Sequence, residues 1–294
     1  MKVSVIILTH KPDECLDETL SILTEDKNIE IIVINSSGQV LRKHDIKIIM
    51  IQPDEFNHGK TRNLGWKESN GDIVVFLTQD SMLTKDAIEN IIKVFDDPSV
   101  GVATGRQLPR KDATPFAAHA RLFNYPEISS IKTFDDKNKY GIKTFFNSNS
   151  FAAYRRKVLE EIGGFPENII ASEDNYLAAK ALMNGYKISY VAQACVYHSH
   201  NYKPMQEFKR YFDIGVFHLR EKWLMETFGK AEGEGKKFVM SEFNYLIKNG
   251  YWYLIPISIY RNALKYIAYR LGKVEKIIPL KIKAKLSMQK EYWK

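Results

Sequence analysis

The sequence predicts an α/β fold with a mostly parallel central sheet, followed by an amphipathic helical C-terminal segment. Its first hundred residues alternate short β-branched apolar runs with segments of helical pattern, which is typical of a parallel sheet covered by helices. A chain of 294 residues with 45% hydrophobic and 27% charged residues is long enough for one large domain with an appendage. We place the domain at residues 1–229 and the appendage at residues 230–294.

Apolar runs mark the expected strands of the first part of the sheet. They are Val3–Thr9, Ile29–Asn35, Ile46–Ile51, Ile73–Leu77 and Val100–Thr104. The segments of helical pattern between them are Pro12–Leu23, Gly59–Ser69 and Thr84–Phe95, with Thr84 as a candidate N-cap. This alternation indicates a doubly wound nucleotide-binding arrangement, in which ligands collect at the carboxyl ends of the strands.

The middle of the chain is expected to hold a substrate loop. Residues Ala113 to Lys143 are aromatic and polar without a clear period, which favours a substrate loop or short helices over a bare connector. Regular structure then resumes as a strand, two helices and an extended run. These are Phe151–Tyr154, Lys157–Ile162, Glu173–Met183 and Tyr186–Tyr197, and each helix ends at a glycine-containing pair.

The net charge of +8 is concentrated in the C-terminal segment. Residues 230–294 hold 14 basic and 5 acidic residues, whereas the rest of the chain holds 29 basic and 30 acidic residues. A nucleic-acid binder is expected to spread its cations over one face with interleaved aromatics, so this distribution argues against nucleic acid as a partner. It indicates a near-neutral globular unit with a segment attracted to an anionic surface.

The cysteines and the N-terminus bear on compartment and enzyme class. Cys15 and Cys195 lie in unlike contexts without CxxC spacing, so we expect neither a disulfide framework nor a zinc knuckle, and a reducing cytoplasm fits best. The apolar N-terminal run is too short for a secretory signal. No GxGxxG follows it, which argues against a dehydrogenase.

Asp80 is a candidate metal ligand, because it follows a strand that is apolar on both faces. Its carboxylate could hold Mg²⁺ or Mn²⁺ against a diphosphate, and the other interpretation is an aspartate that shapes a turn or caps a helix. His198 and His200 end the extended run at a spacing that places both imidazoles on one face. Alone they would be ordinary surface histidines, but combined with Asp80 they indicate a metal or pyrophosphate site.

Glu173 and Asp174 open a predicted helix. The helix dipole alone favours acidic residues in a first turn. The alternative is that one of them is a general base, which takes the proton of a sugar hydroxyl as that hydroxyl attacks an anomeric carbon. Attack from the face opposite the leaving group needs no covalent intermediate and inverts the anomeric configuration.

The passage from Phe56 to Asn63 enters another predicted helix with Lys60 and Arg62 in its first turn. Positive charges at the N-terminus of a helix interact unfavourably with the helix dipole, so their presence here requires another explanation. Binding of a phosphate or nucleotide at the free backbone amides supplies one.

In their joint order, these passages resemble the family 2 glycosyltransferases of the GT-A fold, and within them the rhamnosyltransferases that use dTDP-L-rhamnose. The similarity runs from Val3 to about Phe217. It rests on Phe56 to Asn63, Phe76 to Asp80, Ser148-Asn149, Gly163 to Glu167, Glu173-Asp174 and Val196 to His200.

The resemblance implies a divalent metal, Mg²⁺ or Mn²⁺, and a nucleotide-sugar donor. Asp80 would be the metal-binding aspartate, with His198 supporting the metal and leaving diphosphate and His200 as a further candidate ligand. Asp174 would be the catalytic base, next to Glu173. The implied nucleotide-sugar site is lined by Thr9, Asn35, His58, Arg62, Asn63, Gln79, Ser148 and Asn149. The chain departs from the family pattern at Thr78, where the DXD motif has its first aspartate, and at Asn35, where many members have a base-contacting aspartate.

Other donors and functions stay open. The same fold could use a UDP-hexose or a UDP-N-acetylhexosamine, since fold does not fix substrate. A non-catalytic nucleotide-sugar or glycan-binding module is a further alternative, against which the presence of Asp174 argues. The expected acceptor is a glycan or a polyprenyl-linked glycan of cell-surface polysaccharide synthesis, and the sequence leaves a homo-oligomer open.

The C-terminal segment is expected to lie on the inner face of the cell membrane without crossing it. Its most apolar stretch, Tyr251–Ile259, is shorter than the roughly 20 residues that a spanning helix needs. The expected apolar face holds Tyr260, Leu264, Ile267, Leu271 and Val274, with Arg261, Lys265 and Lys273 elsewhere around the helix. Lys281, Lys283 and Lys285 would add attraction to anionic lipid. The alternative is a helix packed on the domain with a solvated basic end.

Overall fold

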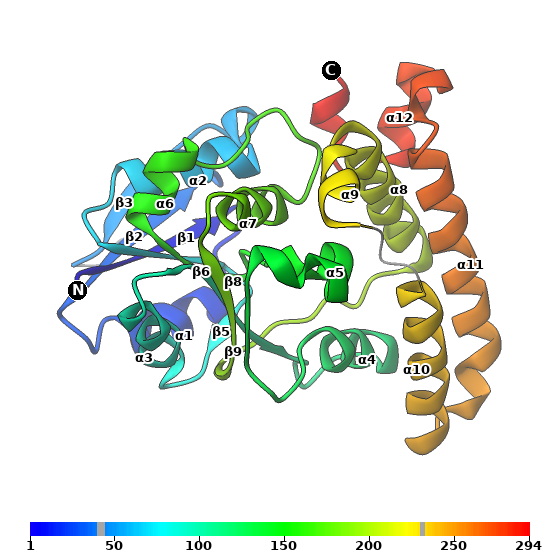
Figure 1. Cartoon of the computed structure of the whole chain (residues 1–294), viewed down its shortest axis with the longest axis horizontal. Coiled ribbons are helices and arrows are strands. Elements are labelled where there is room, and N and C mark those ends of the chain that lie inside the picture. Colours follow the sequence, from blue (N-terminus) through cyan, green and yellow to red (C-terminus); the bar gives the residue numbers. More distant parts are fainter. Residues whose placement is uncertain (40–44, 230–232) are drawn as a thin grey trace.

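The computed structural model describes residues 1–39, 45–229 and 233–294. Its strands are β1 (Val3–Thr9), β2 (Ile29–Asn35), β3 (Lys47–Met50), β4 (Ile73–Thr78), β5 (Met82–Leu83), β6 (Val100–Leu108), β7 (Ser130–Lys132), β8 (Phe151–Arg155) and β9 (Lys187–Tyr197). Within the described residues they form a 9-stranded sheet in the order β3-β2-β1-β4-β8-β6-β9-β5, and β7 pairs with β9 beside this path. The predicted α/β class is confirmed (Figure 1).

The expected parallel arrangement holds for β3, β2, β1 and β4. The whole sheet is mixed, however, because β8 lies antiparallel between β4 and β6. The chain leaves β6 at its carboxyl end and re-enters the sheet close to that end, where the side chains of Gln107 and Ser148 are hydrogen-bonded. Because β8 starts at the sheet edge where β6 ends, it must run antiparallel to β6. The turn before β8 therefore lies beside the carboxyl ends of β4 and β6.

Helices cover both faces of the sheet (Figure 1). On one face lie α1 (Glu14–Leu23) and α3 (Ala87–Ile92), and on the other lie α2 (His58–Lys67), α6 (Arg156–Ile162) and α7 (Glu173–Met183). Alternate side chains of a strand point to opposite faces, so Val5 and Ile7 of β1 join one hydrophobic cluster while Ile6 and Leu8 join the other. Burial on both faces explains why the early strands are continuous apolar runs.

The predicted elements differ from the observed ones mainly at their ends. β6 continues past Thr104, its predicted end. The helix predicted to start at Thr84 begins at Ala87, and Thr84 is not its N-cap: its hydroxyl donates to the carbonyl oxygen of Cys195 at 3.0 Å, beside the pairing of β5 with β9. The expected loop or short helices between residues 113 and 143 contain α4 (Pro115–Asn124) and α5 (Lys137–Tyr140), together with β7.

The C-terminal helices pack on the domain through α8 and through the contact of α10 with α4, where Nε2 of His119 lies 3.0 Å from Oγ of Ser241. They are α8 (Pro204–Arg220), α9 (Trp223–Phe228), α10 (Glu234–Lys248), α11 (Ile255–Gly272) and α12 (Leu280–Leu286). Backbones approach closely where α8 meets α11, since a Cβ atom on Gly272 would lie 2.2 Å from the carbonyl oxygen of Phe212. Ala268 and Trp293 belong to the same hydrophobic cluster as Phe212. The proposed boundary at residues 229 and 230 adjoins residues 230–232, which lie outside the described residues.

The packed face of α11 differs from the one that its sequence pattern predicts. Leu264 and Leu271 pack against the core, whereas the exposed members of the expected face are Tyr260, Ile267 and Val274. Arg261 and Lys265, which the pattern places away from the apolar face, are both buried and contact the carboxylate of Glu207 in α8, at 3.0 and 3.3 Å. This shared acidic partner explains how two cations can face inward. No helix in the described ranges has the length and apolarity to cross a membrane.

Candidate active site

The carboxyl ends of β1 and β2 form the first part of the site. Thr9 and Asn35 are partners in the register of these two strands. Asn35 shapes the turn after β2, since its side-chain oxygen accepts the backbone N–H of Ser37 at 2.8 Å. Gln79 closes the turn after β1, because its side-chain oxygen accepts the hydroxyl of Thr9 at 2.7 Å and the backbone N–H of His10 at 2.8 Å. These side chains therefore hold the two turns at the edge where the nucleotide is expected.

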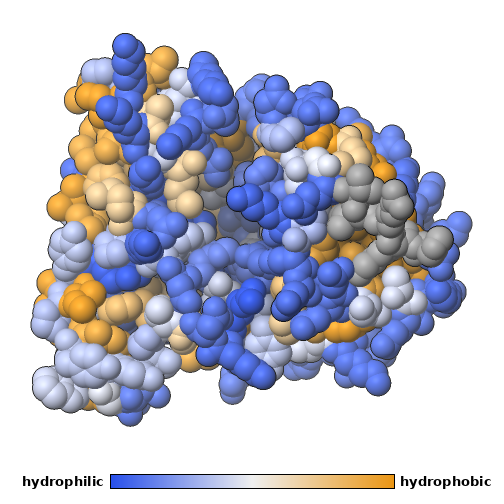
Figure 2. Space-filling view, turned by 180° about the vertical axis from the view of Figure 1, so that it is seen from behind, coloured by the Kyte–Doolittle hydropathy of each residue, from blue (hydrophilic) through white to orange (hydrophobic). Residues whose placement is uncertain are grey.

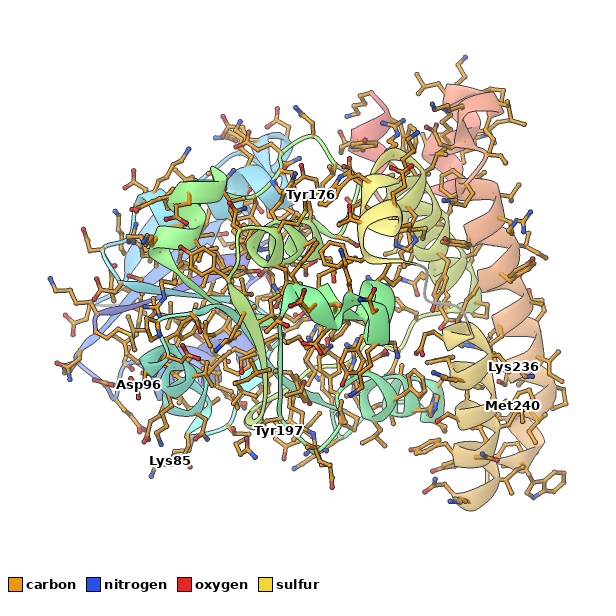
Figure 3. The ribbon with its side chains drawn as sticks, in the orientation of Figure 1. Lys85, Asp96, Tyr176, Tyr197, Lys236 and Met240 are labelled. Carbon is orange, nitrogen blue, oxygen red and sulfur yellow. The ribbon has the colours of Figure 1, made fainter. Side chains whose placement is uncertain are left out.

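Asp80 lies beside two histidines at the next strand end. It follows β4, and the short strand β5 that comes after it pairs with the end of β9, which brings His198 and His200 to the carboxylate. Oδ2 of Asp80 is 3.3 Å from Nε2 of His198 and 3.7 Å from Nδ1 of His200. One ligand atom of each residue lies within 4.8 Å of the other two. Tyr197, labelled in Figure 3, marks the end of β9 immediately before this triad.

The protonation states of the triad suit a divalent cation. Burial alone would raise the pKa of Asp80, but its interactions with His198 and His200 outweigh burial and hold that pKa well below its usual range. Burial lowers the pKa of His198 and lowers that of His200 to about 4. An ionised carboxylate and neutral imidazoles are the forms that bind metals. Because imidazole nitrogens suit transition metals better than they suit Mg²⁺, this donor set favours Mn²⁺ over Mg²⁺.

Gln107, which the sequence pattern does not indicate as a site residue, connects the triad to the turn before β8. Its side-chain oxygen accepts the Nδ1–H of His198 at 2.9 Å and an N–H of Arg121 at 2.6 Å, while its Nε2 donates to the hydroxyl of Ser148 at 3.0 Å. A proton fixed on Nδ1 leaves the Nε2 lone pair of His198 free for a metal. The signal for Gln107 in the sequence is its place near the end of β6, which we expected to stop earlier.

Asp174 lies in the first turn of α7 with both carboxylate oxygens engaged by backbone amides. Oδ2 accepts the N–H of Asn149 at 3.1 Å, and Oδ1 accepts the N–H of Asn175 at 2.8 Å. Burial, followed by the negative charge of Glu173, raises the pKa of Asp174 to about 6. The helix is entered through Ser172, whose φ of 63° is unusual for a residue other than glycine and is typical of functional sites. A carboxylate with this pKa suits general-base catalysis near neutral pH.

Glu173 forms a buried ion pair with Arg62. Nη1 of Arg62 lies 2.5 Å from Oε1 of Glu173, and their side chains are 4% and 10% exposed. Burial alone would raise the pKa of Glu173, but the charge of Arg62 outweighs it and lowers that pKa. Arg62 also donates to the carbonyl oxygen of His58, the first residue of α2, at 3.2 Å. This pairing explains a cation in the first turn of α2 without a bound phosphate, and it positions the start of α7.

Asn63 binds the glycine-containing loop between α6 and α7. Its Nδ2 donates to the carbonyl oxygen of Phe165 at 2.9 Å, and its Oδ1 accepts the N–H of Phe165 at 2.8 Å. Gly164 has a φ of +83°, and a Cβ atom there would lie 2.4 Å from Oδ1 of Asn63. We expected Asn63 at the nucleotide. Because its hydrogen bonds are filled inside this contact, we assign it to the packing of the loop.

The site residues thus fall into three neighbouring groups. At the ends of β1 and β2 lie Thr9, Asn35 and Gln79. The central group joins the triad through Gln107 to Ser148, and Asn149 joins this turn to Asp174. Behind Asp174, on the side of α2, lie Glu173, Arg62, His58 and Asn63.

A mixed α/β sheet with polar turns, an Asp–His–His cluster and a buried carboxylate at one edge is the arrangement expected of a nucleotide-sugar-dependent transferase. The chain belongs to glycosyl transferase family 2, whose family model matches residues 4–163. It is 45% identical over 304 residues to the O-antigen chain rhamnosyltransferase RfbN of Salmonella typhimurium, covering 100% of this chain and 96% of that relative. It is 47% identical over 272 residues to the O-antigen chain rhamnosyltransferase WbaN of Salmonella anatum, covering 90% and 86%.

Solved structures with the same fold include two enzymes with different donors. Mannosyltransferase PcManGT from Pyrobaculum calidifontis, in complex with GDP-Man and Mn²⁺, has a TM-score of 0.57 at 19% identity, covering 99% of this chain and 84% of that one. TarS residues 1–349 of S. aureus, in complex with UDP-GlcNAc, has a TM-score of 0.53 at 15% identity, covering 94% and 91%. At these identities the likeness concerns the fold, and it confirms the predicted GT-A architecture.

Proposed function

We propose that this glycosyltransferase transfers L-rhamnose from dTDP-β-L-rhamnose to a glycan or polyprenyl-linked acceptor in cell-surface polysaccharide synthesis, with inversion at the anomeric carbon. The two O-antigen chain rhamnosyltransferases, similar over nearly their whole length, support the sugar and the pathway. The observation that carries the chemistry is the placement of Asp174 and the Asp80 triad on one hydrogen-bonded framework at the sheet edge.

Each part of this framework has a separate task in the transfer. A divalent cation held by Asp80, His198 and His200 would supply positive charge against the leaving diphosphate. Asp174 takes the proton of the acceptor hydroxyl while its oxygen attacks the anomeric carbon, and the electron pair of the broken bond leaves with the diphosphate. Glu173 is held by Arg62 in an ion pair, which supports a direct displacement by the acceptor rather than a covalent intermediate on a second carboxylate.

A panel of nucleotide sugars tests the donor. With Mn²⁺ present, we expect nucleoside diphosphate release from dTDP-β-L-rhamnose to exceed release from UDP-glucose or UDP-N-acetylglucosamine by roughly tenfold or more, as expected for a donor whose sugar hydroxyls are matched by the site. Faster release from a UDP-hexose or UDP-N-acetylhexosamine would replace rhamnose as the donor. A folded protein that binds but never cleaves any of these donors would instead be a binding module.

We further propose that the C-terminal helices rest on the inner surface of the cell membrane. Apolar and aromatic side chains are exposed on the turn before α11 and along its outer face, namely Trp252, Tyr253, Ile257, Ile259, Tyr260, Tyr266 and Ile267. Figure 2 shows apolar side chains gathered on the side that these helices form, and Met240, labelled on α10 in Figure 3, is also exposed. Lys281 and Lys285 are exposed nearby in sequence, whereas Lys283 is engaged by Glu275 at 2.5 Å. Exposed aromatics beside lysines suit the surface of an anionic bilayer.

Flotation with lipid vesicles tests this surface. Because α11 packs on α8, a truncation would expose the core, so we compare the full chain with a variant carrying Trp252→Ser, Ile259→Ser and Tyr260→Ser. The full chain should float with anionic vesicles. The variant should bind them at least roughly tenfold more weakly, because apolar area drives interfacial binding. Substitution of the exposed Met50, Leu122 and Ile128 by serine is the matched control. Equal flotation of the chain and the triple variant would refute a membrane role for this face.

A further inference from the structure

The connection between β9 and α8 carries a row of three aromatic rings. It comprises residues 198–203 and has no regular secondary structure. The ring centres of His198 and His200 are 4.6 Å apart, and those of His200 and Tyr202 are 4.9 Å apart. The two intervening residues bind the segment before α4 instead. This alternation continues the two-sided pattern of β9, so Tyr202 lies on the same side as the two histidines.

The two histidines of the triad are held in different ways. His198 is fixed by hydrogen bonds, because its backbone N–H donates to the carbonyl oxygen of Leu108 at 2.9 Å and its Nδ1–H donates to Gln107 at 2.9 Å. The ring of His200 is contacted by the neighbouring rings, and its plane is inclined by 32° to that of Tyr202. The orientation of the His200 imidazole therefore depends on the position of Tyr202.

Arg261 of α11 fixes the backbone of Tyr202. Its Nη2 donates to the carbonyl oxygen of Tyr202 at 2.9 Å, and its Nε lies 3.0 Å from Oε2 of Glu207 in the first turn of α8. The side chain is buried, with its guanidinium carbon 4.5 Å from the ring centre of Phe116 in α4. Because a guanidinium group is planar and rigid, it holds both partners at fixed positions. The helix α11, which lies along α8 in Figure 1, thus holds the end of the connection.

The pairing of Glu207 does not by itself explain Arg261. Lys265, one turn further along α11, lies 3.3 Å from Oε1 of the same carboxylate. Without Arg261, Glu207 would therefore keep a cationic partner. Within the residues that the structure describes, the hydrogen bond from this pair of cations to the connection comes from Arg261 and not from Lys265. The distinctive contact of Arg261 is the one with Tyr202.

We propose that Tyr202 and Arg261 are positioning residues of the metal site. Arg261 fixes the backbone of Tyr202. The ring of Tyr202 in turn holds the imidazole of His200 beside Asp80. This inference rests on the metal site of the proposed function and adds a part that the C-terminal segment supplies. The helices after residue 229 then belong to the catalytic unit and are more than an appendage to it.

Titration with Mn²⁺, followed by electron paramagnetic resonance, tests the role of Tyr202 without relying on activity. The full chain is titrated with the metal alone and with a nucleoside diphosphate present. In Tyr202→Leu we expect Kd for Mn²⁺ to rise roughly tenfold, the scale found for residues that orient a metal ligand, because leucine presents no flat ring to His200. Tyr202→Phe keeps the ring and should retain the affinity. The thermal midpoint of Tyr202→Leu should change little, since Tyr202 is only half-buried.

A double-mutant cycle shows whether Tyr202 acts through His200. His200→Ala alone should weaken Mn²⁺ binding. Adding Tyr202→Leu should cause no further loss, because the ring then has no imidazole to orient. Independent losses that simply add, or wild-type affinity in Tyr202→Leu alone, would overturn the proposal.

Arg261→Gln and Lys265→Gln form a matched pair for the second residue. Each removes one of the two cations beside Glu207, so both should lower the thermal midpoint by a similar amount. Arg261→Gln also removes the hydrogen bond to Tyr202 and should raise Kd for Mn²⁺ roughly fivefold, the scale of one lost hydrogen bond, whereas Lys265→Gln should not. Equal Mn²⁺ affinities in the two variants would leave Arg261 with a packing role only and overturn its part in the proposal.

The same titrations separate this inference from the choice of donor. They contain no sugar donor, so a wrong donor sugar leaves their outcome unchanged. If Asp80→Ala bound Mn²⁺ as tightly as the wild type, the metal would lie elsewhere, and the metal site and this inference would fail together. Weaker binding in Asp80→Ala with unchanged binding in Tyr202→Leu would overturn the inference alone.

Discussion

Replacement of Asp174 by asparagine is expected to lower kcat by roughly a hundredfold or more, the scale of general-base catalysis, while donor binding stays near that of the wild type. Asparagine has nearly the same shape and can still accept one of the backbone N–H bonds from Asn149 or Asn175. It cannot take the proton of the acceptor hydroxyl. Single-turnover kinetics and donor titration separate the two effects. Asp86→Asn is the matched control, because Asp86 is exposed and makes no side-chain cap bond.

The same carboxylate should set the acid limb of the pH profile. Burial and the charge of Glu173 raise the pKa of Asp174 to about 6, and only the ionised form can accept a proton. Activity should therefore rise as pH increases through about 6 and fall as Asp174 becomes protonated below that value. In Asp174→Asn this limb should disappear. Turnover near the wild-type rate, with the limb intact, would remove Asp174 from the role of base.

Replacement of Asp80 by alanine is expected to reduce transfer by roughly a hundredfold or more, the scale of lost electrostatic stabilisation of a leaving group. Of the three residues in the triad, Asp80 carries the carboxylate. It contributes the negative charge that neutral His198 and His200 lack. Its loss should weaken metal-dependent donor binding, in contrast to Asp174→Asn. The fold should persist, because Asp80 lies at the strand end outside the hydrophobic clusters.

Binding of Mn²⁺, measured by electron paramagnetic resonance, checks this effect without relying on activity. The wild type should bind Mn²⁺ in the presence of the nucleoside diphosphate, and Asp80→Ala should bind it markedly more weakly. Asp86→Ala should behave like the wild type. Undiminished Mn²⁺ binding by Asp80→Ala, with normal thermal stability, would place the metal elsewhere.

The parts of the fold that depend on local pattern could be predicted from the sequence. The bounds predicted for β1 and β2 are the observed ones, because short runs of β-branched residues bounded by polar residues favour a strand. The rule that ligands collect at the carboxyl ends of parallel strands correctly predicts that Thr9, Asn35 and Asp80 lie at one edge of the sheet. The triad was predictable because His198 and His200 share a face at the end of an extended run.

Contacts between residues far apart in the sequence could not be predicted, because the spacing of apolar residues along one helix or strand does not identify the element that packs against it. The sequence pattern attributes Arg62 to a phosphate or nucleotide site, whereas its charge is matched by Glu173, more than a hundred positions further along the chain. The burial of Arg261 and Lys265 could not be predicted, because the pattern of a single helix gives no sign of a buried acid such as Glu207 on its neighbour. Gln107 was missed because a polar residue in an apolar strand is informative only once the strand's end is known.

The anomeric configuration of the product tests the central claim, a direct displacement driven by Asp174, most directly. The enzyme is incubated with dTDP-β-L-rhamnose, Mn²⁺ and an acceptor, and the anomeric proton and carbon of the product are read by NMR. The arrangement of one carboxylate outside an ion pair, Asp174, with Glu173 held in its ion pair by Arg62, predicts an α-linked rhamnoside. A β-linked product would mean that the configuration is retained, which a single displacement cannot produce.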